Sequence, residues 1–179
     1  KSSHAEGFLA QSNGRFSHAE GNETIASKDC SHAEGNTTQA NGKNSHAEGN
    51  QTLANGENAH AEGELTGAYG KSSHSEGKQC SAAGAYSHAQ NLGTLAYSDC
   101  QTVQGKYNKA DDKEKYAVIV GNGEYSGNRS NAHTLDWSGN AWYSGEIEDG
   151  KGNKLSDKAD KTLAFTGVIN ITADSTTIN

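Results

Sequence analysis

The chain has 179 residues, of which 31% are hydrophobic and 22 are glycine, and it carries a formal net charge of -7. The negative charge argues against nucleic acid or an anionic membrane as the partner, and no apolar run approaches the roughly 18 residues of a membrane-spanning helix. We therefore expect no nucleic-acid binding and no membrane insertion. A mean hydropathy of -0.89 would indicate disorder if the sequence had no internal order.

A repeat of fourteen residues supplies that order. Each copy contains the pentad Ser-His-Ala-Glu-Gly or a close variant, first at 3–7 and last, in degenerate form, at 87–91. A fixed short period is the signature of a solenoid, and this length suits one coil made of two short strands and two tight turns. We therefore predict an all-β fold, a parallel β-roll (β-solenoid) of about seven coils over residues 1–106.

The repeat also predicts which side chains face inward. We number the repeat positions from the serine, so that histidine is at position 2 and glutamate at position 4. Small residues occupy positions 1, 3 and 5 (Ser, Ala, Gly) and positions 8, 10 and 12 (mostly Thr, Ala, Gly). Because strand side chains alternate between two faces, we expect both small sets inside the coil and positions 2 and 4 outside it. Positions 6, 7, 13 and 14 carry residues that favour turns.

The two outward faces differ in regularity. Positions 9 and 11 vary freely, whereas positions 2 and 4 hardly vary at all. Solvent does not require the same residue in every coil but a partner surface does, so we predict that the His/Glu face contacts other copies of the chain. A thin coil lined by small residues buries little apolar area, which also favours an oligomer. The predicted interface residues are His4, Glu6, His18, Glu20, His32, Glu34, His46, Glu48, His60, Glu62, His74, Glu76, His88 and Gln90.

The repeat resembles the head domain of trimeric autotransporter adhesins, whose coil also has fourteen residues and a Ser-Val-Ala-Ile-Gly pentad. The resemblance covers about residues 1–106 and lies in the period and in the small residues. It departs at positions 2 and 4, where this chain has His and Glu in place of Val and Ile. The resemblance implies a left-handed roll in which three chains pack side by side, and hence a homotrimer with a polar interface.

A polar interface of this kind predicts specific pairing. We expect each histidine to be hydrogen-bonded to a glutamate of its own or a neighbouring chain of the trimer, with His46 and Glu48 as a pair in the middle of the roll. Such pairing would raise the pKa of each histidine above its ordinary value and make the trimer most heat-resistant in mildly acidic buffer. The alternative at one or more levels is a metal ion or anion on the trimer axis, held by the histidine column. We otherwise predict no cofactor.

The remaining reactive residues do not predict catalysis. Cys30 and Cys100 share one repeat position but lie five coils apart, roughly 24 Å, which is beyond disulfide reach. Cys80 takes the place of a small buried residue. The glutamates recur in register instead of forming the lone pair of a glycosidase. His133 and Asp136 are a further pair that could interact, but we predict that the chain is not an enzyme.

After residue 106 the pattern changes. Residues 107–115 are highly charged and predict a linker. Residues 116–150 predict a small β module, with a buried strand first and then a hairpin whose tryptophans, Trp137 and Trp142, form its core. Residues 151–179 predict short strands that lead into a further domain. Because Lys1 lies within a repeat, we expect the chain to be part of a longer protein.

The segment from Gly121 to Gly145 resembles one that is common in tail-fibre and minor structural proteins of phages and prophages that infect Gram-positive bacteria. With the roll, it implies a structural segment of a trimeric phage or phage-derived tail fibre, acting as a spacer and as a binder of a bacterial surface glycan or protein. Such a fibre is assembled in the host cytoplasm and lies in the virion tail, which is extracellular after release. The alternative is the head domain of a trimeric adhesin on the bacterial cell surface.

Overall fold

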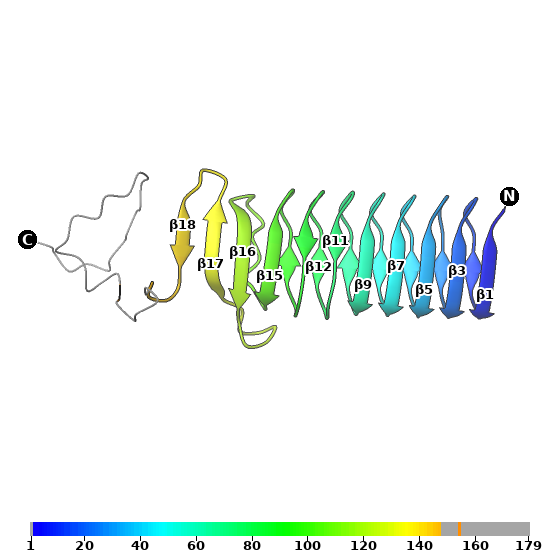
Figure 1. The fold of residues 1–179 in the computed structure, drawn as a ribbon, viewed down its shortest axis with the longest axis horizontal. Helices are drawn as coiled ribbons and strands as arrows, with labels where there is room; N and C mark the ends of the chain where they lie inside the picture. The colour runs from blue at the N-terminus through cyan, green and yellow to red at the C-terminus, as the bar shows by residue number, and fades with distance from the viewer. Residues whose placement is uncertain (1, 148–153, 155–179) are drawn as a thin grey trace, which may run out of the picture.

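The computed structural model describes residues 2–147 and Lys154 and forms an elongated rod, with β1 at one end and β18 at the other (Figure 1). All secondary structure in these residues is β. No helix long and apolar enough to cross a membrane occurs among them. The short strands expected within 151–179 lie outside the described residues, apart from Lys154.

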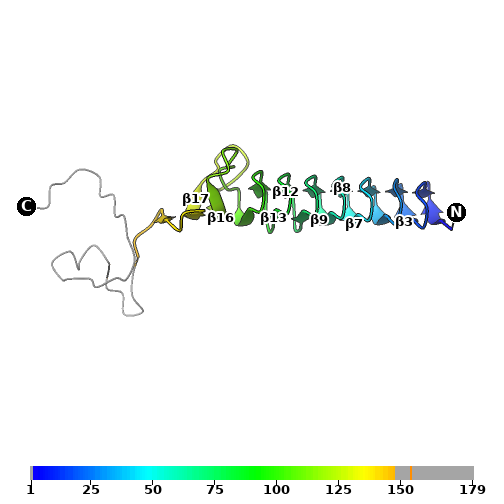
Figure 2. The same ribbon diagram turned by 90° about the horizontal axis from the view of Figure 1, so that it is seen from above.

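The seven histidine-bearing coils each contribute two strands, which lie in two separate sheets. We call the strands of the first sheet the longer strands, because up to β15 all but β11 and β13 have five residues, whereas every strand of the second sheet has two. The longer strands are β1 (His4–Phe8), β3 (His18–Asn22), β5 (His32–Asn36), β7 (His46–Asn50), β9 (His60–Glu64), β11 (His74–Ser75), β13 (His88–Ala89) and β15 (Thr102–Lys106). The shorter strands are β2 (Gln11–Ser12), β4 (Ile25–Ala26), β6 (Gln39–Ala40), β8 (Leu53–Ala54), β10 (Gly67–Ala68), β12 (Ser81–Ala82) and β14 (Leu95–Ala96). Seen from above, the coils follow one another as narrow rungs along the rod (Figure 2).

Successive coils pair in parallel with a register of one repeat. His4 lies opposite His18, Ala5 opposite Ala19, and the same offset continues to β15. The prediction of an all-β parallel β-solenoid is therefore confirmed. Residues of β15 add a rung beyond the seven histidine-bearing coils, because its backbone keeps the frame after His and Glu have been lost from the pattern.

The interior is a stack of small side chains, as predicted for positions 1, 3, 8 and 10. The alanines at positions 3 and 10 are fully buried from Ala19 to Ala96, and in the sixth coil the buried Ser75 takes position 3. A serine at position 1 closes the turn before five of the longer strands, because its Oγ donates to the carbonyl three residues earlier; in Ser45 this bond to Gly42 is 2.7 Å. The cross-section therefore has no room for a large side chain.

The threonines at position 8 are buried but differ in their hydrogen bonds. Thr66 and Thr94 donate their hydroxyls to the carbonyls of Glu62 and Gln90, at 3.0 and 3.1 Å. Thr38 is equally buried, yet its Oγ1 has no hydrogen-bond partner among the described residues. An unpaired buried hydroxyl is costly, so identical residues at one repeat position contribute unequally to stability.

Thr38→Val should therefore leave the free energy of unfolding unchanged or raise it, because the substitution removes an unpaired polar group and keeps the shape. Thr66→Val should lower it by about 1 kcal/mol, because a hydrogen bond is lost. Chemical denaturation of both variants measures the difference. Equal effects of the two substitutions would contradict this account of the threonine column.

The glycine at position 5 is not inside the coil, contrary to expectation. Gly35, Gly49 and Gly63 are exposed, and their φ angles lie between 102° and 110°. A positive φ interrupts the in–out alternation of the strand, which is why the alternation rule fails here. A Cβ at Gly49 would lie 2.2 Å from the carbonyl oxygen of Gly63 in the next coil. This row is glycine because of its backbone angle and the close approach of the next coil.

Gly49→Ala should therefore destabilise the roll by at least about 2 kcal/mol, from backbone strain and the forced separation of two coils. Gly139→Ala is the matched control, because Gly139 also has a positive φ, of 86°, but no atom lies within 4 Å of its added Cβ. Gly139→Ala should therefore lower the stability only by the strain of a positive φ in alanine. Thermal unfolding compares the two, and an equal loss would show that coil spacing does not restrict position 5.

The end of the roll is closed by residues 107–115, which pack on it. Asn108 stands where the next coil would place a threonine, and its side-chain amide exchanges two hydrogen bonds with the backbone of Leu95, at 2.8 and 3.0 Å. The buried carboxylate of Asp111 accepts from the Tyr116 backbone at 2.7 Å and from Gln101 Nε2 at 3.3 Å. These side chains replace the backbone partners that a further coil would supply, so the charged segment caps the solenoid.

Beyond the cap the longer-strand sheet continues without a break. Strand β16 (Tyr116–Asn122) pairs in parallel with β15, and β17 (Asn131–Asp136) and β18 (Ala141–Tyr143) follow it in antiparallel order. The predicted hairpin is therefore present. The prediction that Trp137 and Trp142 form a core is wrong, because their exposed fractions are 54% and 52%. Among the described residues no second layer covers this three-stranded extension, so it has no interior in which to bury them.

Candidate functional site

The histidines at position 2 form one continuous column along the outer face of the longer strands. Neighbouring imidazole rings stack with centroids 4.7 to 5.1 Å apart, and from His32 onward their planes are within 9° of parallel. The spacing is that of the coils, because each ring stands directly over the same residue of the previous coil. The structure thus brings together all seven predicted histidines, which we call the His column.

The glutamates at position 4 form a second column beside the first, which we call the Glu column. From the third coil onward each glutamate pairs with the histidine of the following coil: Glu34 Oε1 lies 3.4 Å from His46 Nε2, and Glu62 Oε1 lies 3.2 Å from His74 Nε2. Within one chain His46 therefore pairs with Glu34 and not with Glu48, which lies 3.5 Å from His60, and pairing between chains stays a prediction. The His–Glu contacts link one coil to the next.

The first two coils pair differently. His18 Nε2 lies 3.5 Å from Glu20 Oε2 of its own coil, and His4 lies 4.0 Å from Glu6. The change of partner between coils two and three leaves His32 with neither an ion pair nor a hydrogen bond among the described residues. Its Nε2 is shielded from solvent all the same.

The columns lower the pKa of two histidines. For His32 and His60, burial is the largest cause, and the neighbouring imidazoles lower the pKa further. Together these two effects outweigh the nearby glutamates, which raise the pKa. The expectation that glutamate pairing raises the pKa is therefore wrong for these two. A stack of like groups at coil spacing disfavours the charged form, and the sequence pattern alone does not reveal how strong that effect is.

A groove runs along the Glu column. It has a volume of about 650 Å³ and is lined by the glutamates and glycines of the first four coils: Glu6, Gly7, Glu20, Gly21, Glu34, Gly35, Glu48 and Gly49. Its floor is exposed backbone at position 5, where no side chain keeps a partner away. The groove therefore combines a row of carboxylates with a row of accessible peptide groups.

Two features near the columns were not found from the sequence. At position 6, Asn22, Asn36 and Asn50 form an amide ladder with hydrogen bonds of 2.6 and 2.7 Å between coils. The recurrence of asparagine at one position was the signal for it. At the far end of the Glu column, Gln90 donates to Gln104 at 3.1 Å, which extends the column by one rung.

The other candidate residues do not form a site. His133 stacks on Tyr143, with ring centroids 4.4 Å apart, instead of contacting Asp136. Hydrogen bonds from Asn140 lower the pKa of Asp136, whose carboxylate organises the hairpin turn. The three cysteines are free, with Cys80 buried and the other two exposed.

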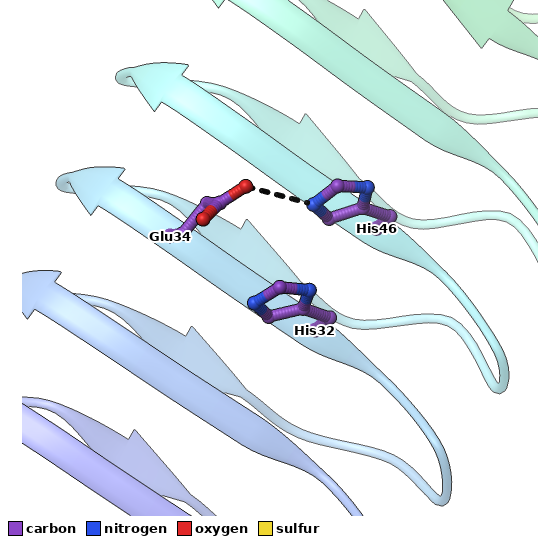
Figure 3. A group of neighbouring side chains, drawn as sticks. All are labelled: His32, Glu34 and His46. Atoms are coloured by element: carbon purple, nitrogen blue, oxygen red, sulfur yellow. Dashed lines mark ion pairs between the residues drawn. The ribbon is translucent and has the colours of Figure 1, made fainter.

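The columns also contain two groups of side chains that could hold a metal ion. The first consists of His32, Glu34 and His46, which project from the adjacent strands β5 and β7 (Figure 3). The second consists of His60, Glu62 and His74. In each group the three candidate ligand atoms lie within 4.8 Å of one another.

Comparisons of the chain with protein-family models, with curated proteins and with solved structures gave no match. The fold and the face together define the chain as a parallel β-solenoid with one regular His/Glu face.

The lowered pKa values predict how stability depends on pH. When the folded-state pKa of a histidine lies below its unfolded value, the unfolded chain binds protons more readily. The contribution of His32 and His60 to the stability of the folded chain is then fully present above their ordinary pKa of 6.5. It is lost as pH falls through 6.5 towards the folded-state pKa. The groups that face them are His18, His46, Glu20 and Glu34 for His32, and His46, His74, Glu48 and Glu62 for His60.

Melting curves between pH 8 and 5 in a chelator should therefore show a falling Tm on acidification. The variant His32→Gln with His60→Gln should show a shallower fall, whereas His133→Gln, outside the columns, should keep the parent slope. A Tm that rises towards pH 5 would contradict the lowered pKa values and favour histidines that are charged and paired with glutamate in the folded chain.

Proposed function

We propose that this chain is a structural segment of a trimeric fibre, and that the His and Glu columns are the face through which the three chains meet. The observation that carries the proposal is the regularity of that face. Histidine recurs in seven successive coils and glutamate in six of them at one spacing, and the pairs from Glu34–His46 to Glu76–His88 remain about one-third exposed in the single chain. A structural spacer is the simplest use of such a rod.

The energetics of the coil support an oligomer. From Ala19 to Ala68 the buried apolar residues are all alanine, so each coil buries few methyl groups and no large side chain. Burial of apolar area contributes only about 25 cal/mol per Å², and alanine offers little of it. A coil of this kind gains from contact with neighbouring chains, and the groove along the Glu column offers backbone that another chain can approach closely.

The resemblance of the repeat to adhesin heads and of residues 121–145 to phage fibre segments supports a phage or phage-derived tail fibre, with a bacterial surface adhesin as the second candidate. In either case the outer face of the shorter strands is the one free to contact a host glycan or protein. Tyr69 and Tyr97 at position 11 stand on it with exposed fractions of 46% and 44%.

The trimer is tested by light scattering coupled to size-exclusion chromatography. The chain should elute at micromolar concentration with three times its 18.7-kDa mass. Glu34→Lys with Glu48→Lys places four units of positive charge change on the proposed interface and should release monomers. Glu57→Lys with Glu114→Lys makes the same charge change at exposed turn residues and should remain trimeric. A folded parent monomer, or dissociation in both variants, would refute the proposed interface.

The cellular role needs a second measurement on the same trimer. Antibodies against the chain should label the tails of phage particles from the source strain in electron micrographs. Labelling of the bacterial envelope without particles would favour the adhesin. Labelling of neither structure would count against both.

A further inference from the structure

We propose that each chain binds two transition-metal ions of the zinc type between successive coils, one at His32, Glu34 and His46 and one at His60, Glu62 and His74. This site lies within one chain and differs from an ion on a trimer axis, which would take one residue from each chain. The inference does not require the trimer, although the same side chains lie on the face proposed for it. The two groups project from β5 and β7 and from the strands β9 and β11.

The donor set fits the ion. Two imidazole nitrogens and one carboxylate oxygen are ligands that zinc accepts, and a fourth position remains for water or another group. Bond lengths of about 2.0–2.2 Å in a tetrahedral arrangement place two ligand atoms about 3.4 Å apart. Glu34 Oε1 and His46 Nε2 are 3.4 Å apart, and Glu62 Oε1 and His74 Nε2 are 3.2 Å apart. In each site the carboxylate oxygen and one imidazole nitrogen thus already have the required spacing.

The second imidazole must move to complete the site. The rings of His32 and His46 are within 5° of parallel, so their nitrogen lone pairs point the same way instead of towards a common ion. Both rings stand on an outer face, and tilting them about their side-chain torsions brings the nitrogens together without moving the strands. In Figure 3 Glu34 lies beside the nitrogen edges of both rings, where such an ion would be held.

The nitrogens themselves supply an independent observation. Nε2 of His32 is shielded from solvent and has neither a hydrogen bond nor an ion pair among the described residues. Nε2 of His46 and of His60 are equally shielded and make no hydrogen bond among these residues, although each lies 3.4 to 3.5 Å from a glutamate oxygen. A shielded polar atom without a partner costs free energy, and a bound cation would satisfy it. Burial also lowers the pKa of His32 and of His60, which favours the neutral imidazole that metals require.

The stoichiometry follows from the ligands. Each imidazole has one Nε2 lone pair, so two sites cannot share a histidine. The two groups share no residue, and Glu48 lies between them along the Glu column without belonging to either. Two ions per chain is therefore the expected number.

Cobalt(II) tests the proposal, because it replaces zinc and reports its ligands by absorption. The full chain, freed of metal by a chelator and kept reduced, should bind two Co²⁺ per chain and show the visible bands of a four-coordinate nitrogen–oxygen site. Glu34→Gln with Glu62→Gln should weaken binding at least roughly 100-fold, since loss of even an outer partner of a metal ligand costs 10–100-fold. The matched control, Glu57→Gln with Glu114→Gln, should still bind two ions.

Circular dichroism verifies the fold of each variant, and His32→Gln with His60→Gln replaces the glutamine pair should that pair not fold. Three results would overturn the proposal: no binding by the parent at micromolar Co²⁺, undiminished binding by the variants of the proposed ligands, or an intense sulfur charge-transfer band. The last would assign the ion to the exposed Cys30 or Cys100.

Discussion

Backbone hydrogen bonds join each coil to the next in a parallel register of one repeat, and this register determines which side chains meet. Because the offset equals the sequence period, every residue stands over its own counterpart. Histidine stacks on histidine, asparagine bonds to asparagine, and the glycine at position 5 meets the carbonyl of the next glycine. Stacking, hydrogen bonding and backbone contacts, which involve single residues in a globular protein, here involve whole columns of equivalent residues.

This register explains the protonation and the ion pairing of the His/Glu face. Stacked imidazoles at coil spacing oppose one another's protonation, while the offset of position 4 places each glutamate near the histidine of the following coil. The columns are therefore coupled along the rod, and a change of pairing direction in one coil leaves an unpaired histidine, His32, at the boundary. The same coupling gathers potential metal ligands without any dedicated loop.

The sequence predicts a large part of this arrangement. Period, parallel pairing, the buried alanines and the outward His and Glu columns follow from repetition and strand alternation alone. The sequence could not reveal the outward position of Gly49, because a positive φ is a property of the folded coil. It could not predict that His46 pairs with Glu34 instead of Glu48, because side chains of adjacent coils lie as close as side chains two residues apart. Trp137 and Trp142 are exposed because no second layer covers β17 and β18 in the part of the chain that the structure describes, and no local pattern encodes that.

The turns have a consequence for how the number of coils in such a rod evolves. Positions 7 and 14 hold left-handed backbone angles in residues as different as Leu9, Phe16, Thr37 and Tyr86. From the second coil onward the backbone N–H at these positions bonds to the preceding coil, as from Thr37 to Asn22 and from Tyr86 to Lys71. The turn conformation therefore recurs whatever the residue type. A duplication or deletion of one whole repeat in the gene would preserve every column and every turn, so the length of the rod can evolve in single-coil steps while its two ends stay unchanged.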